Sequence, residues 1–511
     1  MGIHSSKGAF MFFGGALGLL WDGIIKKGAR SGMTEIEFLE AELARWIQSP
    51  QRHDMLTGIA YYDDHQEIEG KRREMIGRSG QRQPVENLPN FKIMDNQYAK
   101  LVDQKSNYLL SKPLELKTEG KDGPYEKALD DIFNRRFMKL LKNTGKAAIN
   151  CGIGWLYPYI GNDGGLYIQK IPAYQVLPFW HDEDHTQLDA ALRMYPVTVY
   201  EGRNPETVFK VEYYTTDGVR YFIYQNNKLL PDNELTDAAY MTINGQPMNW
   251  TKVPLVAFKA NEEEHPLILR VKCLQDGLNQ LLSNCLDNVS EDVRNTVLVL
   301  KNYDGEDLGE FRRNLMTFGA VKVRDDDYAK GGVETLHIDV NPENYKLVIS
   351  LLKRAIVENG RGFDAKDERF ASGQANQMNI QAAYSDMDLD ANEMESEFQS
   401  SLEDLLWFVN VYLANVQHIK ADSKVEFIFN RDMLTNTAEM IQNCQASLGI
   451  LSKETVVANH PWTTDTAKEL KRIKKEEQEE QAAVDPYGGL FGGHNPQGNG
   501  KGDDNKPPTG E

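Results

Sequence analysis

Residues 267–293 have the sequence LILRVKCLQDGLNQLLSNCLDNVSEDV, in which apolar side chains recur every three or four positions. This spacing predicts a helix of about seven turns with one packed face. A second helical pattern begins at Asn341-Pro342 and continues through Val357. Because a short insert separates the two patterns, we expect an antiparallel pair of helices that carries a small domain at its far end.

The insert between these two helices has the pattern of a small α/β domain. Residues 296–301, 320–323 and 333–338 have the composition of short strands, and residues 308–318 have helical spacing. We therefore expect the insert to form a lobe that projects on a stalk of two helices.

The chain beyond the second helix is first rich in glycine and small polar residues and then strongly acidic. Residues 360–377 carry Arg361, Lys366 and Arg369 in a composition that disfavours a continuous helix. Residues 371–419 contain eight carboxylates and no Lys or Arg. These carboxylates are Asp386, Asp388, Asp390, Glu393, Glu395, Glu397, Glu403 and Asp404. Since the second half of the stretch keeps helical apolar spacing, the pattern favours either a solvated surface helix or a wall that repels anions.

The N-terminal part of the chain has helical patterns. Thr34 followed by Glu37 forms the pattern of a capping box, which predicts a helix through Trp46. A charged stretch punctuated by glycine follows. Helical spacing returns over residues 98–110 and over residues 125–149, and we expect both to be core helices.

From Gly154 the apolar period changes to two. Short alternating runs are separated by turn residues such as Gly161-Asn-Asp-Gly-Gly165, and the last run covers residues 253–259. This region is predicted to consist of antiparallel hairpins. Residues 424–429 have the pattern of one more strand.

The C-terminal part of the chain returns to helical patterns and then loses them. Helices are predicted over residues 437–448, 452–457 and 463–481, with Ser452 and Thr463 as N-caps. Residues 485–511 consist largely of Pro, Gly, Asn and Asp, which predicts a disordered tail.

Length and composition indicate a large folded protein of about three domains. The chain has 511 residues, of which 41% are hydrophobic and 26% are charged. Its net charge of −19 argues against nucleic-acid binding through clustered Lys and Arg, so any contact with DNA should be loose. Four scattered cysteines form no metal-ligand spacing and indicate reduced thiols of a cytosolic protein.

Catalytic motifs are weak in this sequence. Gly145-Lys146 lacks both the first glycine and the Ser/Thr of a phosphate-binding loop, and neither GxSxG nor HExxH occurs. The segment from His181 to His185, with Asp63 and His65, offers potential metal ligands at turns where acidic residues are common. We expect no cofactor, and a metal-dependent hydrolase that uses these residues stays as an alternative.

The first 32 residues have the character of an appendage. Residues 9–21 are uncharged and mostly apolar, and basic residues flank them on both sides. This run is too short to span a bilayer. A membrane-associated structural protein that inserts this run is a second alternative.

Several segments, taken in their order, resemble the portal, or head-to-tail connector, proteins of long-tailed bacteriophages of the siphophage type. They are YYDDHQEI at 61–68, NQYAKLVDQKSNYLLSKP at 96–113, VPLVAF at 253–258, NTVLVLK at 295–301, FRRNL at 311–315, GAVK at 319–322, SG at 372–373, FNR at 429–431 and LSKET at 451–455. The resemblance covers about residues 50–480, and its specificity comes from the number and order of the segments.

This resemblance implies an α+β, predominantly helical portal-type fold with wing, stem, clip and crown, and a ring of twelve subunits at one capsid vertex. A separate ATPase, the terminase, would pump DNA through that ring, and the portal itself hydrolyses nothing. The implied division is an appendage at 1–33, a wing at 34–266, stem helices at 267–290 and 345–361, a clip at 291–344, a tunnel loop at 362–378, a long wing helix and strand at 379–432, a crown at 433–484 and a tail at 485–511.

The resemblance also implies two sets of site residues. The DNA channel would be lined by Lys366, Arg369, Ser372, Gln374, Asn376, Gln377, Asp386, Asp388 and Asp390. The clip would bind partners through Asp304, Glu306, Arg312, Arg313, Asp325 and Asp326. Implied partners are further copies of the chain, the terminase large subunit, a head-completion or adaptor protein, the major capsid and scaffolding proteins, and double-stranded DNA without sequence specificity, but no membrane. The implied location is the virion, and the host cytoplasm during assembly.

Overall fold

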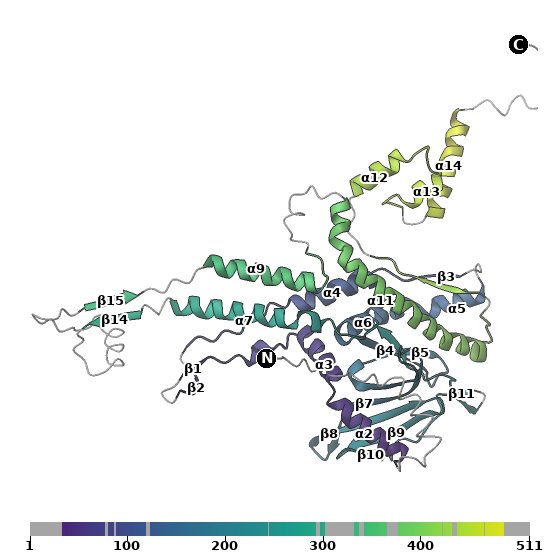
Figure 1. The fold of residues 1–511 in the computed structure, drawn as a ribbon. Helices are drawn as coiled ribbons and strands as arrows, with labels where there is room; N and C mark the ends of the chain where they lie inside the picture. The colour runs from purple at the N-terminus through teal and green to yellow at the C-terminus, as the bar shows by residue number, and fades with distance from the viewer. Residues whose placement is uncertain are drawn as a thin grey trace, which may run out of the picture. The chain divides into compact units, whose positions relative to one another are not determined.

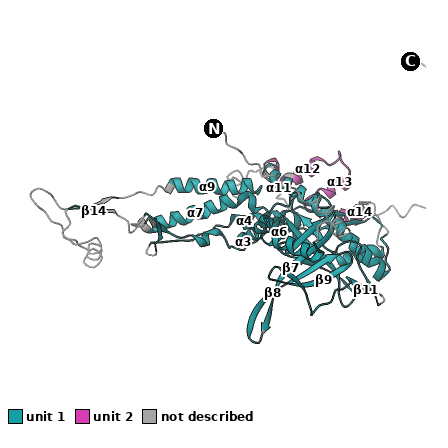
Figure 2. Ribbon diagram, turned by 60° about the horizontal axis from the view of Figure 1, so that its bottom comes forward, with its two compact units in different colours: residues 1–371, 382–433 teal, residues 372–381, 434–511 magenta. Residues whose placement is uncertain are grey.

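The computed structural model describes residues 33–76, 80–85, 88–118, 123–243, 245–292, 297–301, 332–336, 342–364, 377–421, 423–431, 437–463 and 466–484 (Figure 1). These residues divide into two compact units. The first comprises Met1–Ala371 and Ala382–Met433, and the second comprises Ser372–Gln381 and Leu434–Glu511 (Figure 2).

The first unit begins with helices whose ends are set by local capping. They are α2 (Glu35–Ile47), α3 (Pro50–Tyr62), α4 (Gln97–Leu110), α5 (Pro124–Ile132) and α6 (Arg135–Cys151). The predicted capping box is present, because the Thr34 hydroxyl accepts from the Glu37 amide while the Glu37 carboxylate accepts from the Thr34 amide. The charged stretch after this helix begins with α3, which the sequence analysis does not predict and which Ser49 caps, with Pro50 at its first position.

The helix predicted over residues 125–149 is in fact two helices. The chain breaks at Phe133, and Asn134 starts α6 by accepting hydrogen bonds from the amides of Arg136 and Phe137. The ring of Phe133 packs edge-on against Phe137 at a centroid distance of 4.9 Å. The apolar period thus continues across a break that the polar Asn134 side chain creates.

Antiparallel sheets follow, as the alternating patterns predict. The largest has the order β10-β9-β8-β7-β6, and a second has the order β13-β4-β5. The bounds are β4 (Ile153–Ile160), β5 (Leu166–Ile171), β6 (Val176–Trp180), β7 (Leu188–Glu201), β8 (Asn204–Thr215), β9 (Gly218–Gln225), β10 (Lys228–Pro231) and β13 (Val256–Lys259). Two-stranded ladders join β1 (Glu74–Ile76) to β2 (Arg82–Pro84), β11 (Met241–Ile243) to β12 (Gln246–Met248), and β3 (Glu115–Thr118) to β16 (Val425–Ile428).

The two long helices that the apolar spacing predicts lie side by side in Figures 1 and 2. They are α7 (Ile268–Asp292) and α9 (Pro342–Asn359). Between them in the sequence, β14 (Val297–Lys301) pairs antiparallel with β15 (Gly332–Leu336), which confirms two of the strands expected in the insert. The expected helix at 308–318 and the strand at 320–323 lie outside the described residues.

The acidic stretch forms one long helix, α11 (Gln377–Tyr412), which continues into a π-helical turn at Leu413–Gln417. Its apolar stripe is buried as predicted, with Phe398, Leu402 and Val409 each 0% exposed. In the second unit, α12 (Thr437–Ala446), α13 (Lys453–Ala458) and α14 (Thr466–Val484) match the three predicted helices. Ser452 caps α13 as expected, whereas α14 begins three residues beyond the predicted cap Thr463. None of the helices in the described part of the chain is long and apolar enough to span a bilayer, and residues 1–32 lie outside that part.

Candidate functional site

Only part of the predicted site falls on described residues. Within the predicted DNA-channel set, Lys366, Arg369, Ser372, Gln374 and Asn376 lie outside them, and Gln377 is placed as the first residue of α11. The predicted clip set, Asp304, Glu306, Arg312, Arg313, Asp325 and Asp326, lies outside them entirely. The site can therefore be built from Asp386, Asp388, Asp390 and their surroundings.

Asp390 is the centre of a cluster of charges at the junction of three elements. Its carboxylate accepts from Lys105 Nζ of α4 at 2.5 Å and from Arg361 Nη1, just beyond α9, at 2.5 Å. Arg270 Nη1, near the start of α7, is 3.1 Å away. The Asp390 side chain is only 17% exposed and that of Lys105 only 9%. A partly buried carboxylate on α11 thus meets cations from α4, from α7 and from the segment just beyond α9.

The charges of this cluster shift one another's pKa. Burial by itself raises the pKa of Asp390, but Lys105, Arg361 and Arg270 outweigh it and hold the pKa below the ordinary 3.8. Burial also lowers the pKa of Lys105 below 10.5, and Asp390 opposes that effect. The arrangement is a partly buried ion-pair network, in which removing the shared carboxylate would leave the cations around it without compensation.

Asp388 belongs to a second cluster on the same helix. Arg431 donates to Asp388 Oδ1 at 2.9 Å through one guanidinium nitrogen and to Glu395 Oε2 at 2.7 Å through the other. The Tyr108 hydroxyl donates to Asp388 Oδ1 at 2.5 Å, and burial, together with this bond, raises the pKa of Tyr108 above its ordinary 10.0. The cluster attaches the segment after β16 to α11.

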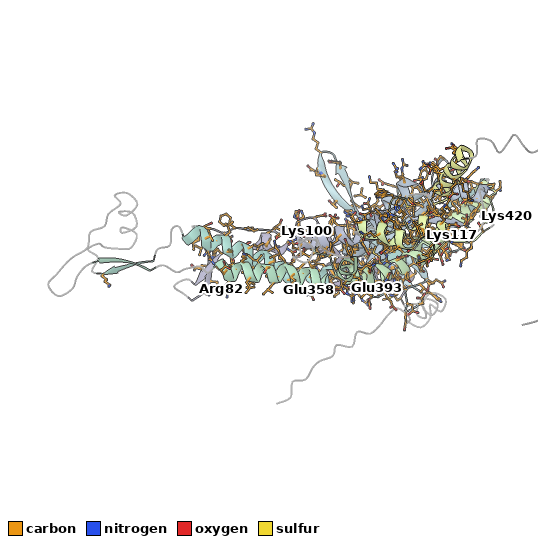
Figure 3. The ribbon with its side chains drawn as sticks, turned by 90° about the horizontal axis from the view of Figure 1, so that it is seen from above. Arg82, Lys100, Lys117, Glu358, Glu393 and Lys420 are labelled. Atoms are coloured by element: carbon orange, nitrogen blue, oxygen red, sulfur yellow. The ribbon has the colours of Figure 1, made fainter. Side chains whose placement is uncertain are left out.

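Ion pairs therefore compensate part of the negative charge of the acidic stretch. Four of its eight carboxylates are paired with cations from elsewhere in the chain, namely Asp388, Asp390, Glu395 and Asp404, the last with Lys252 at 2.8 Å. Asp386 and Glu403, both exposed, have no ion pair within the described ranges. Figure 3 shows Glu393, on α11, and Glu358, near the end of α9, along one edge of the first unit in that view. A uniform anion-repelling wall is thus not what α11 presents.

The segment that leaves α9 is held by several contacts next to Asp390. Gln104 on α4 accepts from the Phe363 amide at 3.0 Å and donates to the Phe363 carbonyl at 2.6 Å. The Phe363 ring stacks on Tyr384 of α11 at 4.3 Å. A Cβ at Gly362 would come within 2.3 Å of the Leu101 side chain on α4, so a larger residue here would have to displace that side chain. The end of α9 is packed closely against α4 and α11.

A ladder of buried polar residues on α7 is not indicated by the apolar spacing that predicts this helix. Gln275, Asn279, Ser283 and Asp287 follow one another at intervals of four, and each is at most 3% exposed. Their side-chain oxygens accept from the amides of Gln97 at 3.0 Å, Asp95 at 3.0 Å, Ile93 at 2.9 Å and Phe91 at 2.7 Å, respectively. The spacing of four was visible in the sequence, but its partners were not.

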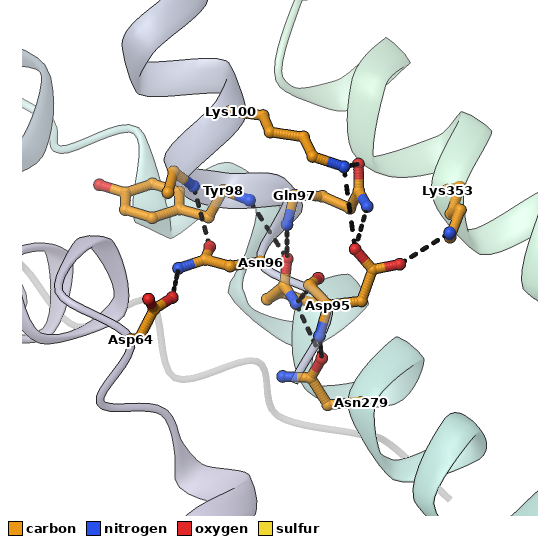
Figure 4. A network of polar contacts seen from close by, with 10 residues as sticks. Asp64, Asp95, Asn96, Gln97, Tyr98, Lys100, Asn279 and Lys353 are labelled. Carbon is orange, nitrogen blue, oxygen red and sulfur yellow. Dashed lines mark hydrogen bonds and ion pairs between the residues drawn. The ribbon is translucent and has the colours of Figure 1, made fainter. Parts of the chain in front are cut away.

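The ladder works because two periods coincide. Four residues of a helix rise about 6 Å and two residues of an extended chain span about 6.6 Å, so every fourth helical side chain meets every second amide. Figure 4 shows Asn279 beside Asp95, and Lys353 of α9 on the other side of the Asp95 carboxylate. The Lys353 to Asp95 ion pair, 2.7 Å long, connects the segment before α4 to α9. The chain before α4 is thereby fastened to both long helices.

The residues of the metal-site alternative are engaged in separate local contacts. His185 Nδ1 lies 2.7 Å from Glu264 Oε1, and His181 Nδ1 lies 3.2 Å from Asp189 Oδ2. His65 lies 3.4 Å from Glu69. Across the described ranges, no three His, Cys, Asp or Glu side chains come together as a metal-binding group. The structure thus does not bring the proposed hydrolase ligands into one site.

The chemistry of these clusters is that of fixed ion pairs and of hydrogen bonds from side chains to backbone, which position one segment against another. Such contacts hold a fold together and do not by themselves define a function. The family model described as phage portal protein, SPP1 Gp6-like, matches residues 47–483, and the chain belongs to this family. Portal proteins are structural components of the bacteriophage capsid and not enzymes.

Two relatives support this membership over most of their length. The portal protein of Bacillus phage SPP1 is 29% identical over 443 residues, which are 85% of this chain and 86% of that protein. The portal protein of Clostridium phage phiCD119 is 23% identical over 465 residues, which are 88% of this chain and 97% of that protein. The family resemblance seen in the sequence is confirmed.

Proposed function

We propose that twelve copies of this chain form a ring at one vertex of a phage capsid, and that the ring is the conduit for DNA during packaging and ejection. The observation that carries this proposal is the family match over residues 47–483, in a chain whose two long helices enclose a small insert. The ring also serves as the docking site for the terminase large subunit and for head-completion proteins. It assembles in the host cytoplasm with major capsid and scaffolding proteins, and remains in the virion.

The elements of the fold take the following roles in this proposal. Residues 267–290 and 345–361, which include most of α7 and α9, form the stem, and residues 291–344 form the clip, which binds partners through the six charged residues named above. Residues 362–378 form the tunnel loop, and α11 is the long helix that adjoins it. Residues 433–484 form the crown, and nearly all of them belong to the second unit. The close attachment of α9 to α4 and α11 supports a rigid base for the tunnel loop.

Self-association is supported by the surface of α9. One face of this helix packs inward through Ile349, Leu352 and Ile356. On the other face Leu347 is 57% exposed and Leu351 is 55% exposed. A helix that is apolar on both faces is normally buried on both, so we infer that a second copy of the chain covers the outer face of α9.

Replacing Leu351 by aspartate should abolish ring formation while the single chain stays folded, because Leu351 makes few contacts within its own subunit. The measurement is negative-stain microscopy of the purified protein, with far-UV circular dichroism as the check of folding. The control is Lys346→Asp, which introduces an aspartate on the same helix about a quarter turn from Leu347. This variant should still form rings. Rings from the Leu351 variant in wild-type yield would contradict this interface, and the absence of rings from the wild type would contradict the proposed function.

Asp386 is the carboxylate of the predicted channel set whose charge is best suited to act on DNA. It is exposed, whereas Asp388 and Asp390 are each held by cations. DNA carries about one negative charge per 1.7 Å, so a free carboxylate near its path lowers adhesion and a cation raises it. We propose that Asp386 lies near the DNA path together with residues 366–378.

Replacing Asp386 by lysine should reduce the length of DNA packaged in vitro, because twelve added cations would bind phosphates. The reduction should shrink as salt is raised, since such binding weakens with ionic strength. Asp386→Asn is the matched control, which removes a charge without adding a cation, and should package nearly as well as the wild type. If the lysine variant packages the wild-type length of DNA at low salt, Asp386 does not lie near the DNA path.

A further inference from the structure

Arg361 has an unusual backbone conformation for its position. Its φ is 48°, in the left-handed region that favours glycine, although glycine stands on either side of it at positions 360 and 362. A side chain at either of those positions would crowd Leu101, since a Cβ on Gly360 would come within 2.5 Å of the Leu101 side chain and one on Gly362 within 2.3 Å. The left-handed position therefore falls on a residue with a long side chain, at a cost in backbone strain.

The contacts of Arg361 offset this strain. Its guanidinium donates to Asp390 at 2.5 Å, and its carbonyl oxygen accepts from Lys105 Nζ, 3.2 Å away. The following amide, that of Gly362, donates to the Val357 carbonyl at 2.8 Å and ends α9. The conformation is thus held by the same buried cluster that joins α9, α4 and α11.

Arg361 is the most exposed member of the cluster. Its side chain is 43% exposed, that of Arg270 is 36% exposed, and those of Lys105 and Asp390 are 9% and 17% exposed. Asp390 keeps Lys105 and Arg270 as partners when Arg361 leaves, so the buried carboxylate does not lose its compensation. Arg361 is therefore the member of the cluster that can separate without unfolding the rest.

We propose that Gly360–Phe363 is a latch between α9 and α11, closed by the Arg361 to Asp390 ion pair and released into a relaxed backbone conformation when that pair opens. The latch has two states because the strained conformation is stable only while the pair and the Gln104 contacts hold it. In a portal ring it would control how firmly the tunnel loop is tied to the stem, a use that rests on the proposed function.

Three variants of Arg361 separate the ion pair from the strain. Arg361→Ala removes the pair and keeps the strain, Arg361→Gly removes both, and Arg361→Lys keeps a cation. We expect hydrogen exchange at the amides of Gly362 and Phe363 to be about tenfold faster in the alanine variant, a change that corresponds to about 1.4 kcal/mol. In the glycine and lysine variants the exchange rate of these amides should stay within about threefold of the wild-type rate.

The measurement is hydrogen exchange by mass spectrometry on the full chain, with peptides from α6 as the check that the first unit stays folded. Raising the salt concentration should speed exchange in the wild type and have little effect in the alanine variant, because only the wild type has the pair. Unchanged exchange in the alanine variant would overturn the latch, and so would a glycine variant as fast as the alanine variant. Faster exchange with wild-type yield of packaged phage would instead overturn its use in the portal, which separates the two proposals.

Discussion

Replacing Asp390 by alanine should lower the free energy of unfolding of the first unit by about 3–5 kcal/mol, the range for removing one partner from a buried ion pair. The reason is that Lys105, 9% exposed, then loses its carboxylate, and Arg270 and Arg361 lose theirs as well. The measurement is urea unfolding followed by tryptophan fluorescence. The pKa of Asp390 is lowered in the folded protein, so the carboxylate stabilises the fold above pH 3.8, and this stabilisation is lost as pH falls through the lowered pKa. The difference in free energy of unfolding between variant and wild type should therefore be as large at pH 5 as at pH 7.

The matched control is Asp404→Ala on the same helix. Asp404 also forms an ion pair, at 2.8 Å with Lys252, but both side chains are nearly half exposed. Exposed ion pairs contribute about 0–1 kcal/mol to stability, so the free energy of unfolding of this variant should be close to that of the wild type. Equal losses from the two substitutions would show that burial of the Asp390 cluster has no special importance.

Replacing Gln275 by leucine should lower the free energy of unfolding by about 3 kcal/mol or more. The Gln275 carboxamide accepts from the amides of Gln97 at 3.0 Å and Tyr98 at 3.2 Å, and donates to the Asp95 carbonyl at 2.8 Å. Each buried polar group left without a partner costs about 1–3 kcal/mol, and leucine fills a similar volume without replacing the bonds. Faster hydrogen exchange at the Gln97 and Tyr98 amides should accompany the loss of stability.

Gln280→Leu is the control for this substitution, because Gln280 lies on the same helix but is exposed, and its one side-chain hydrogen bond within the described part of the chain is to Asn284. A change on such a surface is expected to stay within about 0.5 kcal/mol. If the two leucine variants unfold at the same urea concentration, the ladder does not contribute to stability as described.

Helices governed by local signals were predicted well, and those governed by contacts were not. The helix after Thr34 was found because its capping box closes within three residues. The helix α3 was missed because it contains Gly58, a weak helix former. The structure explains that glycine, since a Cβ there would come within 2.0 Å of the Asn150 carbonyl on α6. Packing against α6, and not propensity, selects the residue.

The candidate site shows the same division. The eight carboxylates of the acidic stretch were recognised from the sequence, but half of them form ion pairs with cations. These cations lie outside the stretch, so a count of Lys and Arg within it could not include them. The polar ladder of α7 was likewise present in the sequence as a spacing of four, yet nothing local revealed that its partners are backbone amides before α4. In both cases the sequence did not show which residue, distant along the chain, forms the ion pair or hydrogen bond with a polar side chain.

By itself, the sequence determined the periodic elements of this protein: the two long helices, the short strands of the insert, the hairpins and the apolar stripe of α11. These depend on contacts within a few residues, which a repeating pattern records. Only the tertiary structure decided the electrostatics, because the partners of Asp390 stand 285, 120 and 29 residues away along the chain. Charges act through distance in space and through burial, and folding sets both, so a run of carboxylates without a base in the sequence became, in the folded chain, the attachment point of three separate elements.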